Sequence, residues 1–365
     1  MLSTLTVRGF RNLTALDLSF PDAGLVIIGE NGQGKTNLLE AVAFLGLLRS
    51  FRGARDPDVV QFGQPACHVR AVLAPPAAWH TVAVGFDRGT KRKQVTLDGV
   101  EAPRLAAALG ALPSVTFAPA DVALVAGGPA ERRHYLDVML AMASPAYLGA
   151  LQRYRGALLR RNAALKLAQR EGGRGDHAAR VSVWEPALAE AGAQLIEARR
   201  QWVTRHEAAY AGLCATIGET QATMLRYQGL TGDAPADALA DAFAQQRAME
   251  MKRGVTLVGP HRDDLVLQLG GRELRTFGSA GQQRSAAIAL RLLELATLRE
   301  ARGYAPLLLL DDPFAELDLG RAERILSLLE AAGVAQVLLA VPRTEDIPDA
   351  FTRLDRRLMR RGALS

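Results

Sequence analysis

At 365 residues the chain is too long for one compact hydrophobic core, so its length predicts two domains. Hydrophobic residues make up 49% and charged residues 22%, and the formal charge of +6 permits a polyanionic partner without requiring one. No apolar run approaches the ~20 residues of a membrane span, and no signal-peptide pattern opens the chain, so we expect a cytoplasmic protein without a membrane partner. The cysteines, Cys67 and Cys214, lie in unrelated contexts, which argues against a disulfide framework or a zinc site.

The first strong motif lies near the N-terminus. Leu25–Ile28 is a short apolar, β-branched run that predicts a buried strand, and a helical pattern follows it after a glycine-rich segment. That segment, GENGQGKT, fits the phosphate-binding loop, whose glycines let backbone N–H groups point at a phosphate beside the positive end of the helix dipole. In such a loop Lys35 reaches the β- and γ-phosphates, and the hydroxyl of Thr36 binds Mg²⁺. The predicted nucleotide-binding residues are Gly29, Glu30, Asn31, Gly32, Gln33, Gly34, Lys35 and Thr36.

A predicted β-hairpin and a long predicted helical segment follow in the middle of the chain. Residues 81–86 and 93–99 flank the turn sequence DRGTKRK and predict a β-hairpin. From about residue 130 to 251 the sequence is rich in alanine and arginine, and helices are expected to dominate. Breaks at Pro145, Gly172–Gly173, Pro186 and Gly232 predict helices of moderate length. This pattern favours a compact helical arm over a long heptad rod.

A second glycine-containing helix start lies at Gly278, in the sequence GSAGQQR. Ser279 suits the N-cap of the following helix, and this interpretation stays open. In one class of phosphate-loop ATPases, however, a serine and a glycine at such a helix start close over the γ-phosphate bound by a neighbouring subunit. The position of this helix before an acidic strand favours the second interpretation, with Ser279, Gly281 and Gln282 as nucleotide-binding residues.

The acidic strand follows. Leu307–Leu310 predicts another buried strand, which ends in Asp311 and Asp312. A carboxylate at this point beside the phosphate loop can hold Mg²⁺, which is the role expected of Asp311. Asp312 is the candidate base that orients or deprotonates water, and Lys35 is its catalytic partner. Acidic pairs are also common at ordinary strand ends, so the interpretation depends on the phosphate loop.

Basic residues are clustered in two places. No acidic residue lies between Asp137 and Glu171, and the hairpin turn is also basic. Such clusters suit sequence-independent contact with DNA phosphates, although a solvated helix face has the same composition. The candidate residues are Arg153, Arg155, Arg160, Arg161, Lys166 and Arg170 in the arm and Arg88, Lys91, Arg92 and Lys93 in the turn. Arg132 and Arg133 could instead form ion pairs with the ATPase lobe.

Further motifs make a family resemblance specific. VRGFRNL (residues 7–13) precedes the phosphate loop as in SMC-like ATPases, while PAERRHYLD (129–137) and GPHRDDL (259–265) are not general ATPase features. Together with RYRGALLRRNAAL (153–165) and GSAGQQR, they resemble the RecF family of bacterial recombination mediators over essentially the whole chain. The resemblance implies an α/β fold: an ABC-type P-loop ATPase head, SMC-like, with an inserted α-helical arm. The expected divisions are an ATPase lobe formed by residues 1–124 and 254–365, and a helical arm at 125–253.

The resemblance also implies a function. It implies binding of ATP and Mg²⁺, ATP-dependent homodimerisation on double-stranded DNA near single-strand gaps, and weak ATP hydrolysis that serves as a switch. It further implies RecR as a partner, with RecO and RecA in the same pathway of RecA loading. Ser279, Gly281 and Gln282 would act on the nucleotide of the partner subunit, and Asp318 would lie on a loop that crosses the dimer seam.

Departures from family patterns leave some roles open. Ala120 stands where the family usually has an acidic residue in the sequence PED, and Asp312 is shorter than the glutamate of transporters, which suits slow hydrolysis. No histidine follows the strand predicted at 336–341, so the residue that senses the γ-phosphate is unassigned. The missing histidine and the large insertion disfavour a transporter-type ABC ATPase subunit, and the breaks in the arm disfavour a chromosome-structuring ATPase with a coiled coil.

Overall fold

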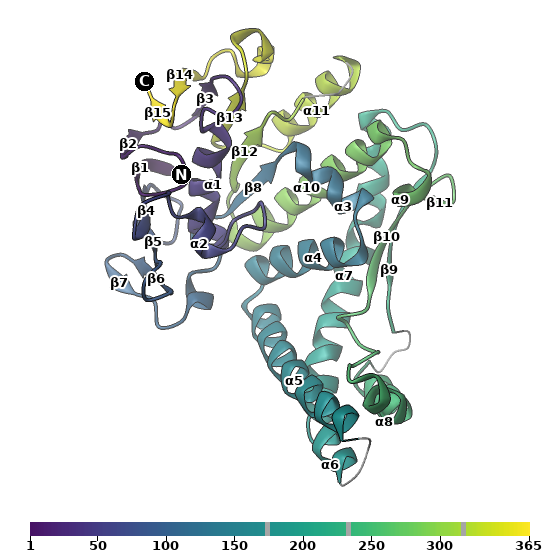
Figure 1. Ribbon diagram of the computed structural model, residues 1–365. Helices are drawn as coiled ribbons and strands as arrows, with labels where there is room; N and C mark the ends of the chain where they lie inside the picture. The colour runs from purple at the N-terminus through teal and green to yellow at the C-terminus, as the bar shows by residue number, and fades with distance from the viewer. Residues whose placement is uncertain (172–175, 231–234, 315–318) are drawn as a thin grey trace. The chain divides into compact units, whose positions relative to one another are not determined.

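The computed structural model describes residues 1–171, 176–230, 235–314 and 319–365, and the chain folds into two compact units (Figure 1). Unit 1 comprises Met1–Val122 and Ala287–Ser365, and unit 2 comprises Ala123–Ala286. The second boundary therefore lies later than the expected residue 254. The physical reason is strand pairing: β10 (Asp264–Leu269) pairs with β9 (Thr223–Gln228) and with β11 (Arg272–Glu273), so this segment completes a sheet of unit 2.

One sheet of unit 1 has the strand order β15-β14-β3-β13-β12-β8. Its first five strands in chain order pair in parallel, and the short C-terminal strand pairs antiparallel. The strands are β3 (Gly24–Ile28), β8 (Ser114–Phe117), β12 (Leu307–Asp311), β13 (Val337–Val341), β14 (Asp355–Arg360) and β15 (Ala363–Leu364). The central strands are continuous apolar runs because both of their faces are covered. Both buried strands predicted from the sequence, at 25–28 and 307–310, are confirmed.

A second, antiparallel sheet of unit 1 has the order β2-β1-β4-β5-β6-β7. Its strands are β1 (Leu2–Arg8), β2 (Leu16–Ser19), β4 (Ala66–Leu73), β5 (Thr81–Asp87), β6 (Arg92–Leu97) and β7 (Val100–Glu101). The expected hairpin is confirmed, since β5 pairs with β6 in a register that places Val84 opposite Val95. The helix α1 (Lys35–Leu47) is buried in a core that side chains of both sheets share. The short helix α2 (Asp56–Val59) precedes β4, and α11 (Leu319–Ala331) lies between β12 and β13 in the chain.

Unit 2 is mainly helical, as the composition indicates. Its helices are α3 (Ala123–Ala126), α4 (Pro129–Ala143), α5 (Pro145–Arg170), α6 (His177–Ser182), α7 (Glu185–Ile217), α8 (Pro235–Arg253) and α9 (Leu274–Phe277). The helix α10 (Ala280–Arg302) begins in unit 2 and continues into unit 1. Pro145 and Pro186 occupy the first turns of α5 and α7, where proline fits, so they start helices of 26 and 33 residues rather than shorten them. The expected moderate helix length was therefore wrong for these two helices.

Buried ion pairs hold unit 2 together. The guanidinium of Arg161 is fully buried and contacts Glu185 at 2.9 Å and Glu250 at 2.6 Å. Assigning Arg161 to DNA contact was therefore wrong, because a sequence cluster of arginines does not show which ones face inward. Arg132 forms a bidentate pair with Asp264, at 2.8 Å for each bond, within the same unit. Asp264 lies in the segment expected to belong to the ATPase lobe, so the predicted ion pair of Arg132 with that segment forms, but the segment itself is part of unit 2.

Candidate nucleotide-binding site

The phosphate loop lies between the end of β3 and the start of α1, as predicted. Two of its glycines show why the loop needs this residue type. Gly34 has a φ of +116°, a left-handed conformation that other residues rarely adopt. A Cβ atom at Gly29 would lie 2.5 Å from the carbonyl oxygen of Met359, so only glycine allows this close approach of two backbones. The loop therefore places backbone N–H groups at the start of α1, where they can bind a phosphate.

The side chain of Lys35 lies back along the loop. Its Nζ donates hydrogen bonds to the carbonyl oxygen of Gly29 and, at 3.1 Å, to that of Glu30. Burial lowers the pKa of Lys35, while the nearby carboxylates of Asp311 and Asp312 oppose this shift. Phosphate oxygens are stronger acceptors for an ammonium group than these neutral carbonyls. Lys35 is therefore positioned to exchange loop contacts for the phosphates of a bound nucleotide.

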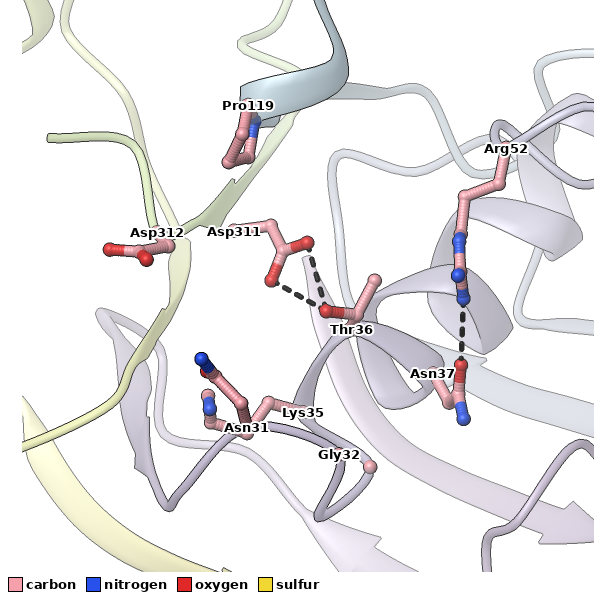
Figure 2. A pocket seen from close by; sticks show the side chains of 10 residues that line it. Asn31, Gly32, Lys35, Thr36, Asn37, Arg52, Pro119, Asp311 and Asp312 are labelled. Carbon is pink, nitrogen blue, oxygen red and sulfur yellow. Dashed lines mark hydrogen bonds between the residues drawn. The ribbon is translucent and has the colours of Figure 1, made fainter. Parts of the chain in front are cut away.

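A direct hydrogen bond joins the phosphate loop to the acidic strand. The hydroxyl of Thr36 donates to both carboxylate oxygens of Asp311, at 2.9 Å each (Figure 2). Burial raises the pKa of Asp311, and the hydrogen bond from Thr36 and the charge of Lys35 counteract this effect. A hydroxyl beside a carboxylate is a ligand set that Mg²⁺ prefers. The structure thus brings together the two residues predicted from distant motifs to hold the metal, and their oxygens fit it.

Asp312 differs from its neighbour in orientation and conformation. Figure 2 shows its carboxyl group directed away from that of Asp311, although both residues line the same cavity. Its φ is +46°, which is uncommon for a residue other than glycine, and its N–H donates to the carbonyl of Ala340 at 2.9 Å. Such conformations cost free energy and are frequent at functional sites. The two acidic residues therefore present their carboxylates in two separate directions.

The residues of both motifs surround a cavity of about 360 Å³, a size typical of small-ligand sites. Sequence reasoning missed three of its lining residues: Asn37, Arg52 and Pro119. Pro119 follows the carboxyl end of β8, which is the neighbour of β12 in the parallel sheet, so topology could have indicated it. The complete lining consists of Asn31, Gly32, Gly34, Lys35, Thr36, Asn37, Arg52, Pro119, Asp311 and Asp312.

The motif VRGFRNL supports this cavity from outside. The Nδ2 of Asn12 donates to the carbonyl of Gly32 at 3.2 Å, and the Oδ1 of Asn12 accepts from Asn37 at 2.7 Å. Arg52 extends the chain of contacts by donating to the Oδ1 of Asn37 at 3.1 Å (Figure 2). The preceding residue, Arg11, forms a bidentate pair with the buried carboxylate of Glu40, at 2.9 and 2.7 Å. The motif therefore fixes both the phosphate loop and α1.

The second glycine-containing helix start belongs to unit 2. The N–H of Ser279 donates to the Oε1 of Gln282 at 2.9 Å, and the N–H of Gln282 donates to the Oγ of Ser279 at 3.3 Å. This reciprocal pair is a capping box, so the N-cap role of Ser279 is confirmed. The action of Ser279, Gly281 and Gln282 on a partner's nucleotide stays a prediction. The predicted seam residue Asp318 lies outside the described residues.

The basic clusters are only partly exposed. In the arm, Arg153, Arg155, Arg160, Lys166 and Arg170 are exposed, but Arg155 pairs with Asp137 at 3.0 Å and Arg153 donates to the Oε1 of Gln194 at 2.9 Å. In the hairpin turn, Lys93 pairs with Asp56 at 2.5 Å and donates to the carbonyl of Leu48. Arg88 donates to the carbonyls of Pro57 and Val60, and Arg92 pairs with Glu101 at the surface. Several of the predicted DNA-contacting cations therefore have structural partners instead.

Similarity to known proteins extends over almost the whole chain. The model of the RecF/RecN/SMC N terminal domain family matches residues 1–362. The DNA replication and repair protein RecF of Symbiobacterium thermophilum is 37% identical over 98% of this chain and 96% of its own length. The corresponding RecF of Halalkalibacterium halodurans is 35% identical over 90% of each chain. The chain belongs to the RecF family.

Solved structures agree with RecF membership. The structure of the recombination mediator protein RecF-ATPrS in the RecFOR pathway aligns with a TM-score of 0.89 and 28% identity, over 100% of this chain and 97% of that one. An Smc head domain of Pyrococcus furiosus aligns with a TM-score of 0.56 and 16% identity, which shows a shared fold alone. The predicted fold, an SMC-like ABC-type ATPase head with a helical insertion, is thus confirmed.

Proposed function

We propose that this RecF-family chain is a cytoplasmic, ATP-dependent DNA-binding protein of recombinational repair and replication. ATP drives its homodimerisation on duplex DNA near single-strand gaps, and slow hydrolysis releases it. The observation that carries the proposal is the contact between Thr36 and Asp311, at 2.9 Å to each carboxylate oxygen, beside Lys35 in one cavity. This contact unites the two elements that a phosphate-loop ATPase needs.

Different residues of the site bind the nucleotide and promote its hydrolysis. The loop N–H groups and the ammonium of Lys35 bind the phosphates and neutralise their charge. Thr36 and Asp311 would hold Mg²⁺, which when bound would supply positive charge to offset that of the phosphates. Asp312, whose carboxyl points in another direction, orients the attacking water and accepts its proton. Because an aspartate reaches less far than a glutamate, this step is slow, as a switch requires.

We propose that each ATP site is completed by the partner subunit. Ser279, Gly281 and Gln282 would then contact the γ-phosphate after the capping pair between Ser279 and Gln282 opens or reorients. The relatives' RecFOR pathway supports RecR as the protein partner, with RecO and RecA acting in the same pathway. Exposed cations of the arm, such as Arg153 and Arg160, are candidates for contact with duplex DNA.

Sedimentation with and without ATP, in the presence and absence of gapped DNA, tests the proposal. We expect a monomer without ATP and a dimer with ATP, and gapped DNA should shift the balance further toward the dimer. A monomer under all four conditions would contradict the proposed switch.

Mixing two inactive variants tests the shared site. Lys35→Ala and Ser279→Arg each disable both sites of a homodimer, but a mixed dimer has one site with intact Lys35 from one chain and intact Ser279 from the other. Partial recovery of ATP hydrolysis on mixing is expected. If mixed dimers form and no activity returns, Ser279 is an N-cap and nothing more.

A further inference from the structure

The chain ends in a short, tight hairpin. Strand β14 turns at Arg361 and Gly362 into β15, and Met359 pairs with Leu364. The φ angles of the turn residues are +48° and +79°, as in the two-residue turns that join tight β-hairpins. Because β14 also pairs in parallel with β3, whose end leads into the phosphate loop, the hairpin lies beside that loop (Figure 1).

Hydrogen bonds connect the hairpin turn directly to the phosphate loop. The N–H of Gly362 donates to the carbonyl of Gln33 at 2.8 Å, and the N–H of Arg361 donates to the Oε1 of the same glutamine at 2.7 Å. On the other side, the N–H of Thr14 donates to the carbonyl of Gly362 at 3.0 Å. A Cβ atom at Gly362 would lie 2.0 Å from the carbonyl oxygen of Asn12, so the turn fits closely. A shift of the turn must therefore be transmitted to Gln33.

The same hairpin carries a dense and unpaired positive charge. Five arginines in or just before the hairpin are exposed. Within the described part of the chain, none of their guanidinium groups takes part in an ion pair or hydrogen bond. This distinguishes them from Arg161, Arg88 and Lys93, which fold contacts engage. Since the fold makes no use of these charges, they indicate a polyanionic ligand. These arginines are Arg356, Arg357, Arg360 and Arg361 of the hairpin and Arg353, which lies two residues before β14.

We propose that this C-terminal hairpin binds the phosphate backbone of duplex DNA and couples DNA binding to the phosphate loop of the same chain. The inference rests on the proposed function and adds to it a surface and a route of communication. Guanidinium groups bind phosphates bidentately and without regard to base sequence. An acidic protein is a less suitable ligand, because protein interfaces depend on apolar anchors and the hairpin exposes only Leu358 as a large hydrophobic side chain among its described residues.

The coupling between DNA binding and ATP binding is reciprocal. DNA that orders the arginine-rich turn also restrains Gln33 and hence the phosphate loop. If DNA binding changes the affinity for ATP by a given factor, ATP must change the affinity for DNA by the same factor. The expected factor for coupling of this kind is roughly 5- to 150-fold.

A matched pair of triple variants tests the surface. Arg356→Ala/Arg357→Ala/Arg360→Ala removes three charges from the hairpin. The control removes three exposed arginines from elsewhere in unit 1: Arg49→Ala/Arg70→Ala/Arg104→Ala. Binding of a fluorescein-labelled blunt duplex is measured by anisotropy over a range of salt concentrations. For the hairpin variant, the log–log salt dependence should become shallower by about 0.9 for each DNA phosphate that the protein no longer neutralises, while the control keeps the wild-type slope.

The outcomes separate this inference from the proposed function. If the wild type binds no duplex, the proposed function itself fails. If the wild type binds but the hairpin variant keeps its slope, or the control shows an equal decrease, the hairpin is not the DNA surface. Labelled poly-glutamate that binds the wild type as tightly as the duplex, and does not bind the hairpin variant, would instead make the hairpin a site for acidic proteins.

Titration of a fluorescent ATP analogue with and without the duplex tests the coupling. In the wild type the two affinities should differ, and in the hairpin variant their ratio should approach one. Equal affinities in the wild type, at a duplex concentration that saturates the protein, would overturn the proposed connection through Gln33.

Discussion

Replacing Arg161 should destabilise the helical unit rather than weaken DNA binding. The side chain is fully buried, and its Nη1 contacts the Oε2 of Glu250 at 2.6 Å and the Oγ1 of Thr256 at 2.9 Å. Its Nη2 contacts Glu185 at 2.9 Å. Arg161→Ala therefore leaves a cavity and two carboxylates without their central cation.

The loss of Arg161 affects the carboxylates of Glu185 and Glu250 differently. Glu185 keeps the guanidinium of Arg247, at 2.5 Å, so its charge stays compensated. Glu250 is fully buried and keeps a hydrogen bond from the N–H of Leu257 at 2.7 Å and a longer-range attraction to Arg247, but no direct ion pair among the described residues. Leaving one charge of a buried pair without its partner costs about 3–5 kcal/mol. Most of the destabilisation is thus expected from Glu250.

The neighbouring arginine provides a matched control. Arg160 is exposed and lies with its guanidinium 5.3 Å from the ring centre of Trp184, a contact worth about 0.5–1 kcal/mol at an exposed site. Urea denaturation followed by tryptophan fluorescence reports mainly on the helical unit, which contains Trp184 and Trp202, two of the three tryptophans. The double variant Arg161→Leu/Glu250→Leu removes both charges and should recover part of the stability.

Equal, small decreases in stability for Arg161→Ala and Arg160→Ala would refute the buried-pair reasoning. A weaker salt dependence of DNA binding in Arg161→Ala, at unchanged stability, would restore the original interpretation of this arginine as a phosphate contact.

The other predictions concern chemistry and pH. Asp312→Asn should keep binding ATP and Mg²⁺ but lower the hydrolysis rate by roughly 10²- to 10⁴-fold, and a wild-type rate would exclude Asp312 as the base. Burial lowers the pKa of His261 to about 4, below the 6.5 of an exposed histidine, so the unfolded state binds more protons between these values. The free energy of unfolding should therefore fall as the pH is lowered through this window, by on the order of 3 kcal/mol, and the fall should be smaller in His261→Asn. Because burial raises the pKa of Asp311, Mg²⁺-dependent ATP binding should disappear on acidification at a higher pH than an exposed aspartate would give, and Asp311→Asn should remove this dependence.

Much of the site could be predicted because its signals are local. The strand before Gly29, the loop to Thr36 and the acidic strand ending at Asp311 each have a pattern that a short window of sequence contains. The phosphate loop and the acidic strand line one cavity because the carboxyl ends of neighbouring parallel strands share one edge of a sheet.

The missed features depend on contacts between distant residues. Arg52 and Pro119 reach the cavity only because separate segments fold against it. The burial of Arg161 depends on Glu250, which is far away in the sequence, and no local pattern distinguishes it from exposed Arg160. The later boundary between the units likewise follows from pairing of β10 with β9, which hydrophobic periodicity does not specify.

Titration of a fluorescent ATP analogue into the wild type, Lys35→Ala and Lys91→Ala tests the central claim most directly. Lys35 is the charged group of the proposed phosphate site, and Lys91 is an exposed lysine of the hairpin turn in the same unit. Removal of a charge-assisted hydrogen bond worth about 1.5–3 kcal/mol should weaken binding by roughly 10- to 150-fold in Lys35→Ala, while Lys91→Ala should match the wild type. Undiminished affinity of Lys35→Ala would contradict the assignment of residues 29–36 as the ATP site.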